Sequence, residues 1–261
     1  MPFQTISTQR LYQQAAQQIR ELIARGEFRP GDRLPPERDL ARKLGISRPT
    51  VREAMVALEI AGLIEIRTGA GIFVSAAAPL SGSAEVPAAT AAAAFDAGPS
   101  PLELLAARRM IEGEIAAEAA RLATDQHFAA IGETIDEMKA ELVRGGAAHE
   151  ADRAFHRAIA AATGNSVLEP LVDGLFQQIF SPLFDTMSRH VGLPSNLRMT
   201  IADHSAILDA LRQRDGAAAR HAMHSHLRHV EEILMRVADL AAARPSDALL
   251  SPAHDKTDAA S

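Results

Sequence analysis

The sequence contains no cysteine and no tryptophan, and it has a single tyrosine in 261 residues. The absence of cysteine excludes disulfide bonds and metal sites with thiolate ligands. No apolar run reaches the roughly 18–20 residues that a membrane-spanning helix needs. The first residues, MPFQTISTQRLYQQ, lack the apolar core of a secretory signal peptide. We therefore expect a cytoplasmic protein without a membrane partner.

Charge is distributed unevenly along the chain, although the net charge is only −6. Residues 1–74 contain 11 basic and 8 acidic residues, a net charge of +3, whereas the remainder contains 16 basic and 25 acidic residues, a net charge of −9. A positive N-terminal part on an acidic body indicates that a polyanion would bind to the N-terminal part alone. The hydrophobic content of 47% is sufficient for a buried core.

Composition divides the chain into four segments. Residues 76–100 are rich in alanine, glycine, proline and serine and have no amphipathic period, which predicts a linker. The polar last residues, 243–261, are typical of a disordered tail. We expect a small N-terminal domain at residues 1–75 and an all-helical domain at residues 101–242.

The N-terminal domain has the pattern of a winged helix-turn-helix. A first helix is expected at about residues 8–25, and a second begins near Pro36 and breaks at Gly45. A third helix at residues 47–61 follows after a short turn, and two helices joined in this way match the helix-turn-helix motif. Two β-like runs, at residues 63–67 and 72–75, are joined by TGAG and form the wing.

The third helix has side chains suited to DNA. Its inward positions are apolar: Val51, Ala54, Met55 and Leu58. Arg48 and Arg52 are four residues apart and share the other side, where their planar donors suit phosphate or the guanine edge. Ser47 and Thr50 add hydroxyl groups near the helix N-terminus, where backbone N–H groups favour phosphate. Gly69 would let the wing approach a phosphate, although hairpin geometry alone also explains this glycine. The alternative for the helix is a solvated surface with incidental arginines.

The stretch PGDRLPPERDLARKLGISRPTVREAMVALEIAGLIEIRTGAGIFV resembles the winged-helix domain of GntR-type bacterial transcriptional regulators. The resemblance implies that operator DNA is a partner of this chain. It also implies DNA contacts by Arg38, Arg48, Thr50, Arg52 and Gly69.

Three helices of the all-helical domain each place one histidine on an apolar face. Asp152 lies about 40° from His156 around its helix, and His204 and His226 lie on the apolar faces of two later helices. An unpaired buried carboxylate is costly, and a divalent cation would neutralise Asp152. Imidazole and carboxylate ligands suit Zn²⁺, which we expect first, and also Ni²⁺, Fe²⁺ or Mn²⁺. His149 is a reserve ligand, and a packed core histidine is the alternative for any one of these residues.

Arg108 is a further inward polar residue, and Glu112 follows it by one helical turn. One interpretation is a buried ion pair between these two side chains. The other is that Arg108 faces the same cavity as the metal and binds a carboxylate through two parallel hydrogen bonds. A metal and an arginine would together form a site for a small organic acid.

The body also resembles a known domain. The stretches LLAARRMIEGEIAAEAA, DRAFHRAIAAATGN, DHSAILDAL and MHSHL resemble the FCD effector domain of the FadR subfamily. The resemblance implies the metal ligands Asp152, His156, His204 and His226, and effector contacts by Arg108 and Asn165. The chain is similar to uronate- and sugar-acid-responsive members, although LFQQIFSPLFDTMSR lacks the tryptophan that some relatives carry near the pocket.

The sequence therefore predicts a transcriptional regulator, with repression relieved by a small carboxylate as the expected outcome. It would act as a homodimer that reads two DNA half-sites. A metal-dependent hydrolase is one alternative, because an Asp/His₃ site could activate water. No further inward carboxylate or histidine stands ready as its general base, and the nearest candidate, Glu112, is more economically the partner of Arg108. We therefore do not expect an enzyme. A DNA-binding dimer with a purely structural metal is the other alternative.

Overall fold

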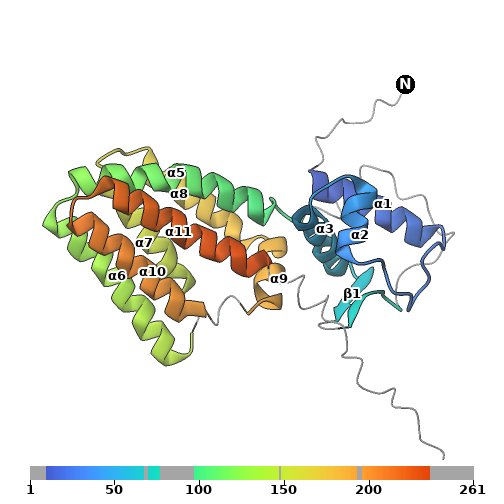
Figure 1. Ribbon diagram of the computed structural model, residues 1–261. Coiled ribbons are helices and arrows are strands. Elements are labelled where there is room, and N and C mark those ends of the chain that lie inside the picture. The colour runs from blue at the N-terminus through green and yellow to red at the C-terminus, as the bar shows by residue number, and fades with distance from the viewer. Residues whose placement is uncertain (1–9, 68–69, 77–96, 147, 193–195, 236–261) are drawn as a thin grey trace, which may run out of the picture.

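The computed structural model describes residues 10–67, 70–76, 97–146, 148–192 and 196–235. It confirms the predicted fold class, mainly α, with an N-terminal winged helix-turn-helix and a C-terminal all-α helical bundle (Figure 1). Most of the predicted linker, the whole predicted tail and the wing residue Gly69 lie outside the described residues. Among the described helices, none combines the length and the apolarity needed to cross a bilayer.

The N-terminal part consists of three helices and a two-stranded wing, at α1 (Leu11–Ala24), α2 (Glu37–Leu44), α3 (Arg48–Ile60), β1 (Ile64–Arg67) and β2 (Gly71–Val74). Gly45 ends α2 with a φ of 68°, in the left-handed conformation that glycine adopts at low cost. Ser47 then begins α3, because its side chain accepts a hydrogen bond from the N–H of Thr50. The strands pair antiparallel, with Ile64 opposite Val74.

The core of the N-terminal part fixes the orientation of α3. Tyr12 and Ile19 of α1 are buried against the inward face of α3, on which Val51, Met55 and Leu58 are fully buried. This face is the one that the apolar period predicts. Because α3 is held through this face, its remaining sides meet either solvent or the rest of the molecule.

The C-terminal body is a bundle of helices, at α5 (Pro101–Leu122), α6 (Asp125–Arg144), α7 (His149–Ala161), α8 (Leu168–Gln177), the short 3₁₀ helix η1 (Gln178–Phe180), α9 (Pro182–His190), α10 (Leu197–Arg212) and α11 (Gly216–Met235). Helix α11 lies along both α5 and α10, and α7 contacts α5, α6 and α8 (Figure 1). Ser100 caps the first of these helices by accepting a hydrogen bond from the N–H of Glu103.

Helices α5 and α11 approach each other closely. A Cβ atom on Gly113 would lie 2.2 Å from Nε2 of His224, so that a larger residue in place of the glycine would collide with the imidazole. The two helices also carry residues of the candidate site. His226 lies on α11, two residues beyond His224 and on another side of that helix, and Arg108 and Glu112 lie on α5.

Candidate metal centre and DNA-binding face

Four potential metal ligands from three helices converge inside the body. Helix α7 contributes Asp152 and His156, α10 contributes His204, and α11 contributes His226. One ligand atom from each residue lies within 4.8 Å of the other three. Nε2 of His204 is 3.3 Å from Oδ1 of Asp152 and 3.3 Å from Nε2 of His226. The structure thus brings together all four residues that the sequence predicts as ligands.

The geometry of this cluster fits a divalent ion. Bonds of about 2.0–2.1 Å in a tetrahedral site place neighbouring ligand atoms roughly 3.3 Å apart, which matches the two distances from His204. Oδ1 of Asp152 and Nε2 of His156 are buried and have no hydrogen-bond partner among the described residues. A buried polar atom without a partner is costly, and a cation between these atoms would satisfy both.

Two histidines of the cluster, His204 and His226, favour their neutral forms. Burial lowers the pKa of His204 well below its ordinary value, and the nearby His226 and His156 lower it further. Burial also lowers the pKa of His226, although the neighbouring Asp203 acts in the opposite direction. A neutral imidazole retains the lone pair that a metal needs, so these environments favour ligation.

The Nδ1 atoms of the three histidines lie in different environments. Nδ1 of His156 lies in contact with Oε2 of Glu112, although the two are not aligned as a hydrogen bond. Nδ1 of His226 is 3.5 Å from Oδ2 of Asp203. His204 stacks on Phe155 with ring centroids 3.8 Å apart, and its Nδ1 has no hydrogen-bond partner in the part of the chain described.

A cavity of about 90 Å³ adjoins the cluster. Its polar lining consists of Arg108, His149, Asp152, Thr200 and His226, and the remainder of its wall is apolar. Asp152 and His226 therefore belong both to the cluster and to the cavity wall. His149, the reserve ligand, lies in this wall and is not a member of the cluster.

Arg108 lines this cavity and is also part of a buried ion pair. Its Nε donates a hydrogen bond of 2.6 Å to Oε1 of Glu112, and its guanidinium lies over the ring of Phe176, 4.2 Å from the centroid. Burial alone would raise the pKa of Glu112, but Arg108 and His156 outweigh it and hold that pKa below its usual range. The ion-pair interpretation is confirmed, and carboxylate binding by Arg108 stays a prediction.

Asn165 lies apart from the cavity beside Arg108. It is exposed in the turn after α7, and its Oδ1 accepts a hydrogen bond of 3.0 Å from the N–H of Val167. It is not among the residues that line the cavity beside Arg108. The residue forms the turn that leads into α8, and its predicted role in effector binding stays a prediction.

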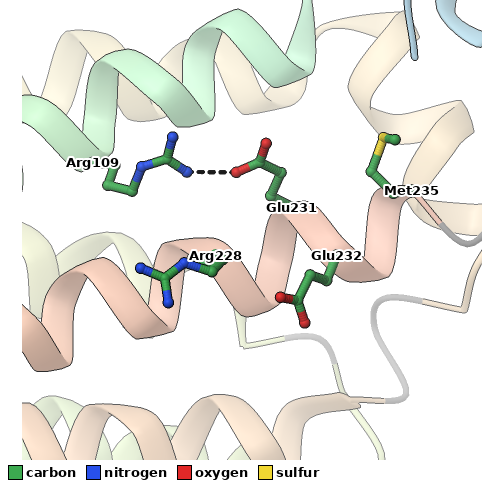
Figure 2. A pocket seen from close by; sticks show the side chains of 5 residues that line it. All are labelled: Arg109, Arg228, Glu231, Glu232 and Met235. Atoms are coloured by element: carbon green, nitrogen blue, oxygen red, sulfur yellow. Dashed lines mark hydrogen bonds and ion pairs between the residues drawn. The ribbon is translucent and has the colours of Figure 1, made fainter. Parts of the chain in front are cut away.

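A larger hollow of about 530 Å³ lies on the surface between α5 and α11 (Figure 2). Its lining residues are Arg109, Arg228, Glu231, Glu232 and Met235, and Arg109 is paired with Glu231 at 2.5 Å. Charges of both signs are present, and none of these side chains is fully buried. The smaller cavity beside the cluster is therefore the better candidate for an effector, because two of its polar lining residues, Arg108 and His226, are buried inside the bundle.

The predicted DNA-binding residues divide into two groups. Arg38, Ser47 and Arg48 are exposed, and Thr50 is half-buried at the N-terminal end of α3. The hydroxyl groups of Ser47 and Thr50 are 2.8 Å apart, so that both take part in the helix cap. Ser47, Arg48 and Thr50 lie at the N-terminal end of α3, whereas Arg38 lies on α2, and DNA contact by these residues stays a prediction.

Arg52 differs from this group, and the expected solvent-facing position is wrong. Its side chain is 2% exposed, with Nη2 3.0 Å from Oε2 of Glu37 on α2. Its Nη1 donates to the carbonyl oxygen of Met235, at the end of α11. Helical spacing from Arg48 could not reveal this, because both partners come from other elements. In this conformation, Arg52 is not available to DNA.

Besides Arg52, two acidic residues of α3 contact the C-terminal body. Oε1 of Glu53 accepts a hydrogen bond of 2.5 Å from the hydroxyl of Ser100, and burial raises the pKa of Glu53 to about 7. Oε2 of Glu59 is 2.5 Å from Nε2 of His190, at the end of α9. The body therefore holds α3 at three places along its length.

Comparison with known proteins agrees with both parts of this architecture. Residues 11–74 match the model described as bacterial regulatory proteins, gntR family, and residues 103–229 match the FCD domain. The chain is 38% identical to the Uxu operon transcriptional regulator of Escherichia coli (strain K12), over 90% of each chain. It is 35% identical to the Exu regulon transcriptional regulator of the same strain, over 86% of this chain and 84% of that one.

Among solved structures, a Streptococcus agalactiae GntR protein is 24% identical, with a TM-score of 0.43, over 85% of this chain and 99% of that one. The matches to the two domain models divide the sequence as the structure does, into a winged head and a helical body. The curated relatives resemble the chain over most of its length. The chain therefore belongs to the GntR family of bacterial transcriptional regulators, with an FCD domain as its C-terminal body.

Proposed function

We propose that this chain represses transcription from operator DNA, and that a small carboxylate bound at a metal site in the body controls its operator affinity. The observation that supports this most directly is the cluster of four ligand atoms within 4.8 Å of one another, which opens onto a cavity lined by Arg108. A cation and a guanidinium on the same cavity are complementary to an organic acid.

Asp152, His156, His204 and His226 would hold the metal, with Zn²⁺ expected and Ni²⁺, Fe²⁺ or Mn²⁺ as alternatives. The bound ion would supply a positive charge at one end of the cavity. Arg108 would bind the carboxylate, and Thr200 of the cavity wall would orient hydroxyl groups of the ligand.

The effector class is a sugar acid or hydroxy acid, as the resemblance to uronate-responsive regulators implies. A volume of about 90 Å³ corresponds to roughly three water molecules. A uronate is larger than this, so its binding requires the side chains of the cavity wall to move. A conformational change on binding is therefore part of the proposal.

Regulation requires that the effector bind two arrangements of the protein with unequal affinity. The proposed domains are a DNA-binding domain at residues 1–75, a linker at 76–100, an effector and dimerisation domain at 101–242 and a tail at 243–261. A homodimer would present two N-terminal domains to two-fold related half-sites. Because operator DNA is the target, the protein would act in the cytoplasm.

A thermal-shift screen of sugar acids and hydroxy acids, with and without a chelator, tests this proposal. We expect an acid that raises the melting temperature only in the presence of metal, and that also releases operator DNA in a mobility-shift assay. An acid that binds with metal but leaves DNA affinity unchanged would favour a structural metal in a constitutive DNA-binding dimer. Equal binding of every acid in the presence of chelator would contradict the metal site.

The alternative of a metal-dependent hydrolase finds no support. The relatives that resemble this chain over most of its length are transcriptional regulators. Glu112, the nearest candidate for a general base, is already in contact with Arg108 and His156. We therefore assign the cluster a role in sensing.

A further inference from the structure

We propose that Glu112 is a positioning residue of the metal centre, which orients the imidazole of His156 and links this ligand to Arg108. The inference rests on the proposed metal site. Glu112 is on α5, a helix that contributes no ligand to the cluster. Through Glu112, α5 would take part in ion binding, and Arg108 of the cavity would be connected to the proposed metal site.

The carboxylate of Glu112 lies between two side chains. Its Oε1 receives a hydrogen bond of 2.6 Å from Nε of Arg108, and its Oε2 is in contact with Nδ1 of His156. Glu112 is 2% exposed, so water does not compete for either contact. A carboxylate buried in this way acts on its neighbours with little dielectric screening.

The contact with Nδ1 determines which nitrogen of His156 is free for a metal. A carboxylate beside Nδ1 favours the tautomer that carries its proton there, which leaves the lone pair on Nε2. Nε2 points into the cluster, 3.8 Å from Oδ1 of Asp152. Glu112 therefore prepares His156 as a ligand before an ion arrives.

The other two imidazoles depend less on a single carboxylate. Asp203 is 3.5 Å from His226 and is closer, at 2.9 Å, to His229. His204 is held by stacking on Phe155. His156 is thus the ring for which removal of one carboxylate has the largest expected effect on ion binding.

Arg108 completes the arrangement, because its guanidinium holds the carboxylate of Glu112 in place through the buried ion pair and the hydrogen bond to Oε1. A ligand carboxylate that binds Arg108 would compete with Glu112 for the same guanidinium. The carboxylate of Glu112 thus contacts both Arg108 and His156, and it connects the arginine of the cavity to the metal ligand.

The test compares Glu112→Gln with Glu114→Gln in the full-length chain. Glu114 is a matched control, because it lies on the same helix in an exposed ion pair with Arg220. Zn²⁺ affinity is measured by competition with a chromophoric chelator, and the ligand field is measured by the visible absorption of the Co²⁺ form. We expect Glu112→Gln to lower the affinity by about 10–100-fold and to change the Co²⁺ spectrum, whereas Glu114→Gln leaves both unchanged.

Loss of one partner of a buried ion pair can prevent folding, so a second variant is included. The double variant Arg108→Met, Glu112→Gln removes both charges at nearly constant volume, and we expect the same loss of Zn²⁺ affinity. In the unsubstituted Zn²⁺ protein, a long-range ¹H–¹⁵N spectrum should show the proton of His156 on Nδ1. A proton on Nε2, or wild-type affinity in the variants that lack Glu112, would overturn the inference while the metal site stands. Absence of Zn²⁺ and Co²⁺ binding in the unsubstituted chain would overturn both.

Discussion

The buried pair of Arg108 and Glu112 makes the body sensitive to single charge changes. Arg108→Met should lower the free energy of unfolding by about 3–5 kcal/mol, because it leaves the carboxylate of Glu112 buried without its guanidinium. Combining it with Glu112→Gln should recover most of this loss. Urea unfolding of the two single variants and the double variant measures the coupling, and additive losses would contradict a direct interaction.

Metal binding should stabilise the body through His204. At an ion concentration about 100-fold above its dissociation constant, the free energy of unfolding should rise by about 2.7 kcal/mol. His204→Ala should abolish this rise, because it removes the side chain whose Nε2 lies closest to two other ligand atoms. His221→Ala, at an exposed position on α11, is the control. Thermal melting with and without chelator measures both, and an undiminished metal effect in His204→Ala would exclude that residue as a ligand.

For individual residues, helical periodicity predicts which side chains point inward, but it does not predict which residues of other helices they contact. Asp152, His156, His204 and His226 were identifiable because each lies on an apolar face of its own helix. The contact of Glu112 with His156 depends on how α5 and α7 are placed, and no spacing within one helix contains that information. Asn165 was assigned to the effector site by resemblance, which stays a prediction, and the Gly-Asn turn signal indicates the local role that the structure shows.

Helix α3 presents two different surfaces along its length. Its N-terminal end is exposed, and residues 51–58 are buried in contacts with α1, α2 and the rest of the molecule. We expect Arg48→Ala to weaken operator binding by roughly 1–3 kcal/mol, because it removes an exposed arginine that can reach bases or phosphates. Arg121→Ala, an exposed arginine on α5, is the control. Fluorescence anisotropy at constant salt compares them, and equal affinities would contradict the recognition-helix assignment.

The elements themselves were largely predictable, because their ends carry strong local signals. Gly45 and Ser47 mark the turn between α2 and α3, and Ser100 and Pro101 mark the start of α5. These local signals do not show which helices and strands pack against one another. Arg52 shows the consequence, because it is buried by partners on α2 and at the end of α11.

The stability of the whole molecule should depend on pH, because Glu53 lies in the contact between the N-terminal part and the C-terminal body. Its pKa of about 7, raised mainly by burial, exceeds the ordinary value of 4.5, so the native protein binds this proton more tightly than the unfolded chain does. Native stability should therefore fall as pH rises from about 4.5 to 7 and then level off. The groups that face Glu53 are Ser100, the N–H of Leu102, Glu103 and Arg52.

Glu53→Gln isolates this contribution, because the other titrating groups remain in both proteins. Relative to this variant, the unsubstituted chain should lose stability on the order of 2 kcal/mol between pH 5 and pH 8. Urea unfolding at a series of pH values measures the difference. A difference that is constant with pH would show that Glu53 does not titrate in the contact.

Helix α11 connects the candidate metal cluster to the contact with Arg52. His226 lies in the metal cluster, and Met235, nine residues later, offers its carbonyl oxygen to Arg52. At 1.5 Å per residue the two are separated by about 13 Å of regular helix, a length over which a helix moves as a unit. If an ion bound at the cluster shifted His226 along the helix axis, the carbonyl oxygen of Met235 would shift with it. The contact with Arg52 of the N-terminal part would then change with occupancy of the proposed metal site.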